Sequence, residues 1–327
     1  MTINEIAEMA GVSRATVSRY LNDGYVSKEK QERIKQVIEE TGYTPSVSAK
    51  LLRSHRTNLV GVIIPKIASD SISRMVSGIS EVLSAEGMQL MLACTNNDEQ
   101  EELKYLKTFS ENHVDGIILL GTMFTPEHKT LIREMKTPVV ILSQKLEGFS
   151  CIYSDDYHAA YSLGKTIARS AQKVGMIMVS ERDIAVGVNR RTGLLDALRE
   201  GGIKVDPSAI RTSGFTIDSG YNETKSLLVE HPDIDTLLCA TDTIACGAIK
   251  CLHDMKISIP RQIQVSGFGD SSVSSAITPS LTTVHFYYEE AGREAATILM
   301  NRIIGSNTTV IKEMQLAYDT VIRDSTR

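Results

Sequence analysis

The chain has 327 residues, more than one hydrophobic core usually supports, so the sequence predicts two or three folded lobes. A hydrophobic fraction of 42% with 23% charged residues is ordinary for a globular protein and excludes extensive disorder. No apolar run approaches the roughly 18 residues that span a bilayer, and the start MTINEIAEMAG lacks the basic and apolar blocks of a signal peptide. These features predict a cytoplasmic protein without a membrane segment.

The net charge of −5 is unevenly distributed along the chain. Residues 1–58 contain nine Lys and Arg against seven Asp and Glu, whereas residues 59–327 contain 26 against 33. This asymmetry is mild, but it has the sign expected of a small DNA-facing head on an acidic body. The charge balance alone does not decide between functions.

The N-terminal segment carries only helix signals. Hydrophobic residues at helical spacing predict a first helix within residues 2–10, which Gly11 ends. Ser13 is placed to cap a second helix over 14–22, and a third helix is predicted over 28–41. Two short helices joined by a turn that contains glycine are typical of a helix-turn-helix, which lays its second helix in the major groove of DNA.

The second predicted helix begins with side chains that can read DNA. Arg14 can make a bidentate contact to guanine, whereas Ala15 offers only apolar contact, for instance to a thymine methyl. Four further residues suit phosphates or nearby bases, namely Thr16, Ser18, Arg19 and Asn22. From spacing alone, a three-helix cap with solvent-facing arginines remains the alternative.

From Leu59 onward, apolar runs such as LVGVIIP, DGIILLG and PVVILSQ alternate with helix-length segments. The alternation resumes at KVGMIMVS and continues through LLCATD, QVSGFG and LTTVHF. Apolar strands without polar alternation indicate parallel sheets covered on both faces. Two such series predict an α/β body of two doubly wound parallel-sheet lobes behind a small all-α head.

The stretch INEIAEMAGVSRATVSRYLNDGYVSKEKQERIKQVIEETGYTPSVSAKLL resembles the head of the LacI/GalR family of bacterial transcriptional repressors, nearly position for position. The phrases VDGIILLG, ATDTIACGAIKCL, QVSGFGD and TPSLTTVHF extend the resemblance over essentially the whole chain. It implies a DNA-binding domain at 1–45 and a hinge helix with a linker at 46–58. It also implies a two-lobed, periplasmic-binding-protein-like domain at 59–327 for effector binding and dimerisation.

The resemblance also implies DNA contacts outside the second helix. Residues 46–54 resemble the family's hinge helix, which is ordered only when two subunits sit together on the operator. Leu52 matches the leucine that wedges into the minor groove, and Ala49 falls where a small residue permits close approach. Leu52 could instead be a core leucine of the adjoining lobe. Thr2 and Tyr43 complete the expected DNA-contacting set.

An effector pocket is expected at the carboxyl ends of the strands, where doubly wound sheets leave a crevice. Arg190 matches the family's arginine that binds an effector hydroxyl or carboxylate, and a guanidinium presents several fixed donors for that task. Phe215 and Tyr288 match positions where an aromatic ring stacks on the ligand, although either could be an ordinary core residue.

Further effector contacts are expected from Ser71 and from Thr241 and Asp242, which follow the strand LLCA. Asp242 could instead cap the next helix. The sequence departs from the family where many relatives read Gly-Tyr/Phe-Asp, because this chain reads Gly267-Phe268-Gly269-Asp270. Asp270 is therefore displaced by one residue, and it either reaches the ligand from a different angle or makes no contact.

These features predict a homodimeric, allosteric repressor that binds a near-palindromic DNA operator and responds to a small sugar or sugar phosphate. The stretches QKLEGFSCIYSDDYHAA and DIAVGVNRR resemble sucrose-type regulators of Gram-positive bacteria. The alternative is a global carbon-catabolite regulator controlled by a phosphorylated partner protein. The sequence contains no catalytic grouping, nucleotide-binding loop or metal-ligand spacing, so no enzyme activity, cofactor or metal is expected.

Overall fold

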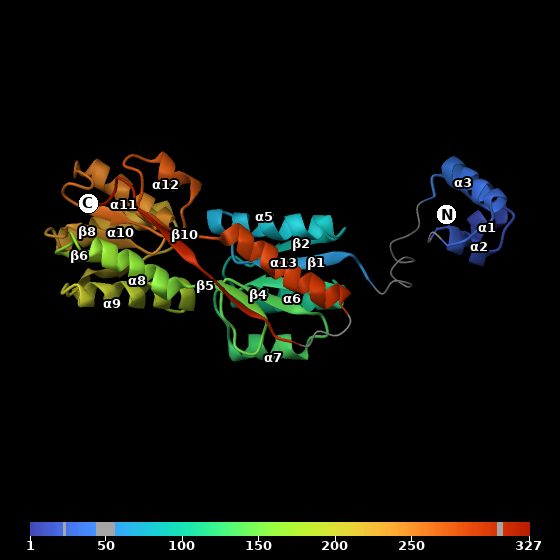
Figure 1. Ribbon diagram of the computed structural model, residues 1–327, viewed down its shortest axis with the longest axis horizontal. Coiled ribbons are helices and arrows are strands. Elements are labelled where there is room, and N and C mark those ends of the chain that lie inside the picture. Colours follow the sequence, from blue (N-terminus) through green and yellow to red (C-terminus); the bar gives the residue numbers. More distant parts are fainter. Residues whose placement is uncertain (22–23, 44–55, 306–309) are drawn as a thin grey trace. The chain divides into compact units, whose positions relative to one another are not determined.

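The computed structural model describes residues 1–21, 24–43, 56–305 and 310–327. The chain divides into two compact units, Met1–Thr57 and Asn58–Arg327 (Figure 1). The first unit is all-α and the second combines helices with parallel sheets, so the predicted fold class is confirmed.

The first unit packs three helices around one small core. They are α1 (Ile3–Met9), α2 (Arg14–Tyr20) and α3 (Lys28–Thr41). The core consists of apolar side chains at the helical spacing read from the sequence, together with Tyr43: Ile6, Ala7, Ala10, Val17, Ile34, Val37 and Tyr43. The second helix ends two residues before the predicted end, because Leu21 is its C-cap.

Capping groups fix where the head helices begin and end. The Thr2 hydroxyl accepts a hydrogen bond from the Glu5 backbone N–H (3.4 Å), and the Glu5 carboxylate accepts one from the Thr2 backbone N–H (2.8 Å). The Ser13 hydroxyl accepts from the backbone N–H three residues on. Ser27 stands before α3 without a side-chain capping bond to a described residue, whereas Gly42 ends that helix at a φ of 62°.

The first lobe of the second unit is a six-stranded parallel sheet in the order β11-β5-β4-β3-β1-β2. Its strands are β1 (Leu59–Ile64), β2 (Gln89–Cys94), β3 (Gly116–Leu120), β4 (Val139–Leu142), β5 (Cys151–Ser154) and β11 (Glu313–Leu316). Helices α5 (Asp70–Ala85) and α13 (Tyr288–Ile304) cover one face, and α6 (Glu99–Glu111) and α7 (Pro126–Glu134) cover the other (Figure 1).

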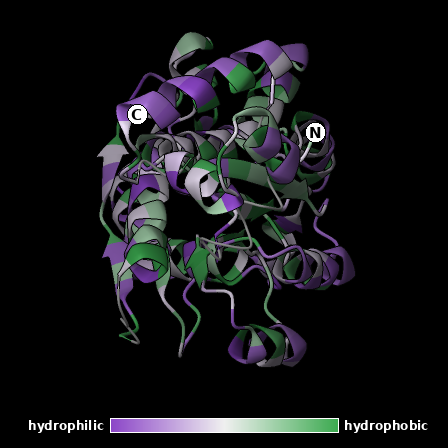
Figure 2. Ribbon diagram, turned by 90° about the vertical axis from the view of Figure 1, so that its right-hand side faces the viewer, coloured by the Kyte–Doolittle hydropathy of each residue, from purple (hydrophilic) through white to green (hydrophobic). Residues whose placement is uncertain are grey.

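The second lobe is a four-stranded parallel sheet in the order β7-β6-β8-β9. Its strands are β6 (Val174–Met178), β7 (Ile210–Thr212), β8 (Thr236–Cys239) and β9 (Gln264–Ser266). The main helices are α8 (Asp156–Ile167), α9 (Arg190–Glu200), α10 (Ile217–Glu230) and α11 (Asp242–Asp254). Shorter helices are η1 (Ile184–Asn189), η2 (Pro207–Ala209) and α12 (Ser272–Ala276). The buried strands carry mostly hydrophobic residues, and the helices carry both hydrophobic and hydrophilic residues (Figure 2).

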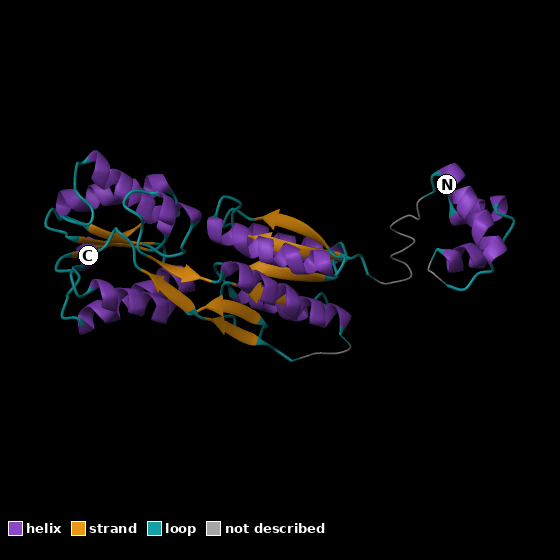
Figure 3. Cartoon of the chain, turned by 45° about the horizontal axis from the view of Figure 1, so that its top comes forward, coloured by secondary structure: helices purple, strands orange, loops and turns teal. Residues whose placement is uncertain are grey.

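The chain passes between the two lobes three times. It crosses from β5 to α8, from β10 (Thr283–Phe286) to α13, and from β11 to β12 (Tyr318–Val321) (Figure 3). The sequence LTTVHF was expected to continue the parallel series, and its Thr282 does form an isolated parallel bridge with Ser266 at the end of β9. Its strand β10 also pairs antiparallel with β12, a pairing that was not predicted, because both strands belong to these connections. The two lobes are therefore tied together by three backbone segments, an arrangement suited to hinge motion.

Helices α5 and α13 cross at two glycines that leave no room for a side chain. A Cβ atom at Gly78 would lie 2.0 Å from the Glu289 carbonyl oxygen, and one at Gly292 would lie 2.0 Å from the Met75 carbonyl oxygen. Both distances are far shorter than a van der Waals contact, so the backbones must separate to accept a methyl group.

Replacing Gly292 with alanine is therefore expected to lower the free energy of unfolding by about 1–3 kcal/mol, although alanine is the better helix former. Chemical denaturation of the whole chain measures this change. Ser77→Ala, on the exposed side of α5, is the control and is expected to change stability little. Equal stability of Gly292→Ala and the parent chain would show that the helices have room to spare.

Candidate functional site

The exposed surface of α2 carries most of the expected DNA-reading side chains. Arg14, Ala15 and Arg19 are exposed, while Val17 is fully buried and anchors the helix in the head core. Thr16 is partly buried, and its hydroxyl lies 2.9 Å from the Ser13 hydroxyl at the start of the helix. Ser18 is also partly buried. The first turn of α2 can therefore meet base edges, as direct readout in a major groove requires.

Tyr43 does not lie on this surface. Its side chain is only 9% exposed and belongs to the head core, because it closes the packing after α3 has ended. Thr2 is exposed and serves as the N-cap of α1. Asn22, Ala49 and Leu52, with the rest of the expected hinge helix, lie outside the described residues.

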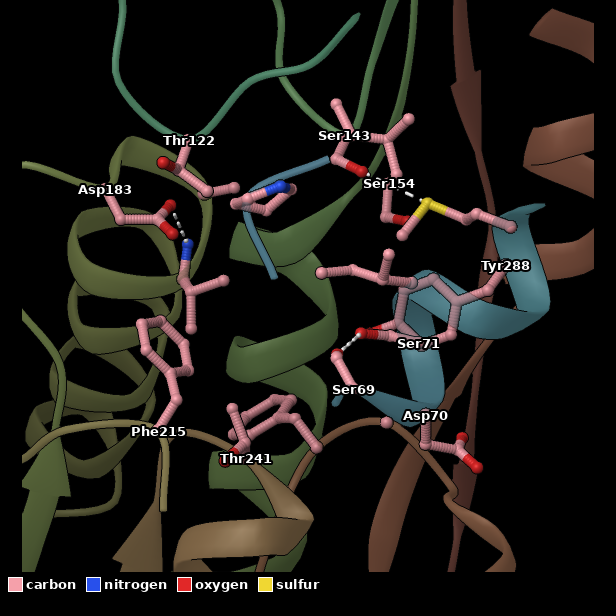
Figure 4. Close-up of a pocket in the computed structure, with 18 of the residues that line it drawn as sticks. Ser69, Asp70, Ser71, Thr122, Ser143, Ser154, Asp183, Phe215, Thr241 and Tyr288 are labelled. Atoms are coloured by element: carbon pink, nitrogen blue, oxygen red, sulfur yellow. Dashed lines mark hydrogen bonds between the residues drawn. The ribbon is translucent and has the colours of Figure 1, made fainter. Parts of the chain in front are cut away.

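A cavity lies between the two lobes, at the carboxyl ends of strands from both sheets (Figure 4). It encloses about 1190 Å³ of empty space, including its open mouth. Residues that follow β1, β3, β4 and β8 line it, as expected for a doubly wound fold. It brings together six of the seven predicted effector residues, which are Ser71, Arg190, Phe215, Thr241, Asp242 and Tyr288.

A buried ion pair forms part of the cavity wall. The Arg190 Nε donates to Asp156 Oδ1 at 2.7 Å, and the guanidinium also donates to the Ala240 carbonyl at 2.9 Å. Both charged side chains are 4% exposed. The guanidinium carbon lies 5.1 Å from the ring centre of Phe268 and 4.8 Å from that of Phe286. These contacts hold the Arg190 guanidinium in one place in the cavity wall.

Burial and charge act in opposite directions on this pair. Burial is the largest single effect and acts to lower the pKa of Arg190, but Asp156 and Tyr288 together outweigh it and raise that pKa, so the guanidinium stays protonated. Burial raises the pKa of Asp156, and the positive charge of Arg190 opposes the rise. Each member therefore depends on the other to remain charged inside the protein.

Thr241, rather than Asp242, caps helix α11, since its hydroxyl accepts from the Ile244 backbone N–H at 3.3 Å. Asp242 is 2% exposed, and its two carboxylate oxygens accept from the Thr283 hydroxyl (2.5 Å) and the Ser271 backbone N–H (2.8 Å). Burial raises the pKa of Asp242, and these hydrogen bonds oppose the rise.

Asp270 is absent from the residues that line the cavity. Its carboxylate accepts from Arg323 at 2.6 Å and faces His285 Nδ1 at 2.9 Å. Burial acts to raise the pKa of Asp270, but these two partners together lower it. The backbone at Gly269 (φ 131°) and Asp270 (φ 46°) enters the left-handed region. The sequence left two alternatives for Asp270, a ligand contact from a different angle or no contact at all. Its position outside the cavity lining agrees with the second alternative.

Three cavity residues that bridge the lobes were not predicted from the sequence. The Lys66 Nζ of the first lobe lies 4.0 Å from the ring centre of Phe215 in the second. The Gln144 Nε2 of the first lobe donates to Asp183 Oδ1 of the second at 2.9 Å, and the Val186 backbone N–H donates to the same oxygen at 3.0 Å. Lys66 directly follows the apolar run LVGVIIP, and Gln144 is the last residue of the run PVVILSQ. Both could have been predicted as cavity residues from the rule that pockets form at the carboxyl ends of strands.

Burial also shifts the pKa values of these bridging groups. It lowers the pKa of Lys66, and the nearby Asp183 opposes that shift. It raises the pKa of Asp183, and the hydrogen bond from the Val186 backbone N–H opposes that rise.

In the parts of the chain that the structure describes, no His, Cys, Asp and Glu side chains gather in threes or more to hold a metal ion. None of the described helices meets the length and hydrophobicity needed to cross a bilayer.

Known protein families match the two units separately. Residues 57–323 match the model of periplasmic binding proteins and the sugar binding domain of the LacI family, and residues 2–46 match that of bacterial regulatory proteins of the lacI family. The chain belongs to the LacI family. The predicted resemblance is confirmed. This LacI-family chain is a DNA-binding regulator whose second unit is a domain of the family's sugar-binding type.

Relatives align with nearly the whole LacI-family chain. The sucrose operon repressor of Staphylococcus xylosus is 34% identical over 294 residues, which cover 90% of this chain and 91% of that repressor. The ribose operon repressor of Bacillus subtilis is 29% identical over 327 residues, covering 100% and 98%. The solved CelR–cellobiose complex superposes with a TM-score of 0.76 at 28% identity, covering 99% of both chains. The operator-bound lac repressor dimer, at 21% identity and a TM-score of 0.87, has the same fold and covers 100% of this chain and 99% of that chain.

Replacing Arg14 with alanine is expected to weaken binding to the cognate operator by about 1–3 kcal/mol and to relax preference at one base per half-site. Selection from a random DNA library, followed by sequencing, measures the preference. Lys35→Ala on the exposed side of α3 is the control and is expected to leave the preferred sequence unchanged. An unaltered preference in Arg14→Ala would remove this side chain from base readout.

Replacing Arg190 with alanine is expected to lower the free energy of unfolding by about 3–5 kcal/mol, because Asp156 is left buried without its partner. Arg191→Ala is the matched control, since this neighbour is partly exposed and forms an ion pair with the exposed Glu181, so its change should stay within about 0.5 kcal/mol. Urea unfolding of the three chains measures both values. Equal stability of Arg190→Ala and Arg191→Ala would mean that the buried pair contributes little.

Proposed function

We propose that this chain is a sequence-specific repressor of a carbohydrate operon, and that a small sugar bound between the lobes controls its affinity for DNA. The observation that carries the proposal is the combination, in one chain, of a helix-turn-helix head with an interlobe cavity, in two segments that each match a LacI-family model. Relatives named as repressors of sucrose and ribose operons support a carbohydrate operon as the target.

The head residues take separate parts in operator binding. Arg14 and Ala15 are proposed to read bases, while Thr16, Ser18 and Arg19 contact phosphates or neighbouring bases. One head reads only half a site, so a two-fold homodimer would read a near-palindromic operator. The operator-bound lac repressor is described as a dimer, which supports the same assembly here.

The effector is proposed to bind against Ser71, Arg190, Phe215, Thr241, Asp242 and Tyr288, and the enclosed cavity favours a small molecule over the partner-protein alternative. A ligand that contacts both lobes changes DNA affinity only if it binds one lobe arrangement better than another. We propose no catalytic activity for this chain, because the matching relatives are transcriptional regulators. Since a repressor acts on the chromosome, we also propose that it works in the bacterial cytoplasm.

The test is a pull-out of sheared genomic DNA by the full chain, with and without a panel of sugars. Enrichment of one near-palindromic motif is expected, with at least one sugar changing the amount of that DNA retained. Recovery of DNA without any shared motif would contradict sequence-specific repression. If one motif is enriched but no sugar changes the amount recovered, control by a carbohydrate would be contradicted and sequence-specific DNA binding would stand.

A further inference from the structure

We infer that the effector of this pocket is an uncharged saccharide, and that the cavity discriminates against its phosphorylated form. The inference rests on the proposed function, because it assumes that the interlobe cavity holds the regulating ligand. It deepens that function by choosing between two chemical classes, sugar and sugar phosphate, that share a hydroxyl-rich ring and differ by about two negative charges at neutral pH.

The charges that line the cavity are mostly negative. Four carboxylates line it, from Asp70, Asp156, Asp183 and Asp242, against the two cations Lys66 and Arg190. Asp70 is balanced by Arg74, which pairs with it at 3.6 Å, so the excess of negative charge comes from the three buried carboxylates. A phosphate site in a protein normally supplies the opposite balance, through arginine forks, lysines or free backbone N–H groups at a helix start. A phosphoryl group entering this cavity would therefore meet like charge in a partly buried, weakly screened setting.

Both lining cations already face acidic or aromatic groups. The Arg190 guanidinium is held by Asp156 and by the Ala240 carbonyl, and it lies between two phenylalanine rings. Lys66 lies over the Phe215 ring, within electrostatic reach of Asp183. A phosphate that drew either cation toward itself would leave Asp156 or Asp183 with a weaker counter-charge.

The helix starts around the cavity are also poorly suited to an added anion. Helix α11 is capped by the Thr241 hydroxyl, and η1 is capped by the Asp183 carboxylate. Helix α5 begins at the cavity with Asp70 in its first turn, so a carboxylate already occupies the favourable end of its dipole. At α11 and η1 an incoming phosphate would compete with the side chains that already satisfy the first N–H groups. Helix α5 has no side-chain cap, so at this helix it is the negative charge of Asp70 that opposes an added anion.

The remaining lining groups suit sugar hydroxyls. Figure 4 shows the hydroxyls of Ser69, Ser71, Thr122, Ser143, Ser154 and Thr241 around the cavity, with the rings of Phe215 and Tyr288. The Ser143 hydroxyl donates to a thioether, Met75 Sδ at 3.1 Å, which is a weak acceptor that a ligand oxygen can replace. Carboxylates accept from hydroxyl donors, and aromatic rings pack on the apolar face of a sugar.

Asp183 is assigned as the side chain that sets this discrimination. The Gln144 Nε2 and the Val186 N–H both donate to its Oδ1, so an asparagine can keep both hydrogen bonds through its own carbonyl oxygen. Asp183→Asn therefore removes one negative charge from the cavity without removing the bridge between the lobes. Asp233→Asn, on an exposed loop of the same lobe, changes the net charge equally and lies outside the cavity.

The experiment is calorimetric titration of the full chain with matched pairs, such as sucrose and sucrose 6-phosphate, fructose and fructose 6-phosphate, and cellobiose and cellobiose 6-phosphate. The uncharged member of at least one pair is expected to bind, and its phosphate at least about tenfold more weakly. In Asp183→Asn that ratio is expected to fall by at least about fivefold, whereas Asp233→Asn keeps it.

The outcomes separate the inference from the function beneath it. A phosphorylated member that binds as tightly as its partner, or more tightly, would overturn the inference and leave carbohydrate control intact. Binding by no member of any pair would overturn both. An unchanged ratio in Asp183→Asn would overturn the assignment of discrimination to this side chain.

Discussion

The buried contact between Arg190 and Asp156 is the interaction on which the proposed effector site depends. Asp156 begins α8 directly after the chain first crosses between the lobes, and Arg190 begins α9 directly after η1. The same guanidinium holds the Ala240 carbonyl, just beyond the end of β8. Two charges placed in the interior are tolerated only together, so the pair fixes three elements of the second lobe around one point of the cavity wall.

Contacts between the lobes provide the means of control. Lys66 against Phe215 and Gln144 against Asp183 both cross the cavity, and Arg74 of α5 donates to the Gly269 carbonyl of the second lobe at 3.3 Å. These polar and aromatic contacts surround the space a ligand would enter. A bound sugar that replaces some and strengthens others shifts the balance between lobe arrangements, and three connecting segments limit how far the lobes separate.

Regular patterns in the sequence predicted the fold, because helical spacing, apolar strand runs and capping residues such as Ser13 and Gly42 are local signals. Features that depend on distant parts of the chain were missed. The antiparallel pairing of LTTVHF requires the last strand, and the burial of Tyr43 follows from how three helices close. Strand-end positions and family resemblance located Arg190 and Asp242. The roles of Asp183 and Asp270 depend on partners far away in sequence, Gln144 and Arg323.

The central claim is that occupancy of the interlobe cavity and binding of DNA are coupled, and coupling of this kind is reciprocal. The most direct measurement is the Kd of the active sugar for the full chain, with and without saturating operator DNA. Operator is expected to change the sugar Kd by the same factor, about 5–150-fold, by which sugar changes the operator Kd. A sugar Kd that is identical in the presence and absence of operator would contradict it.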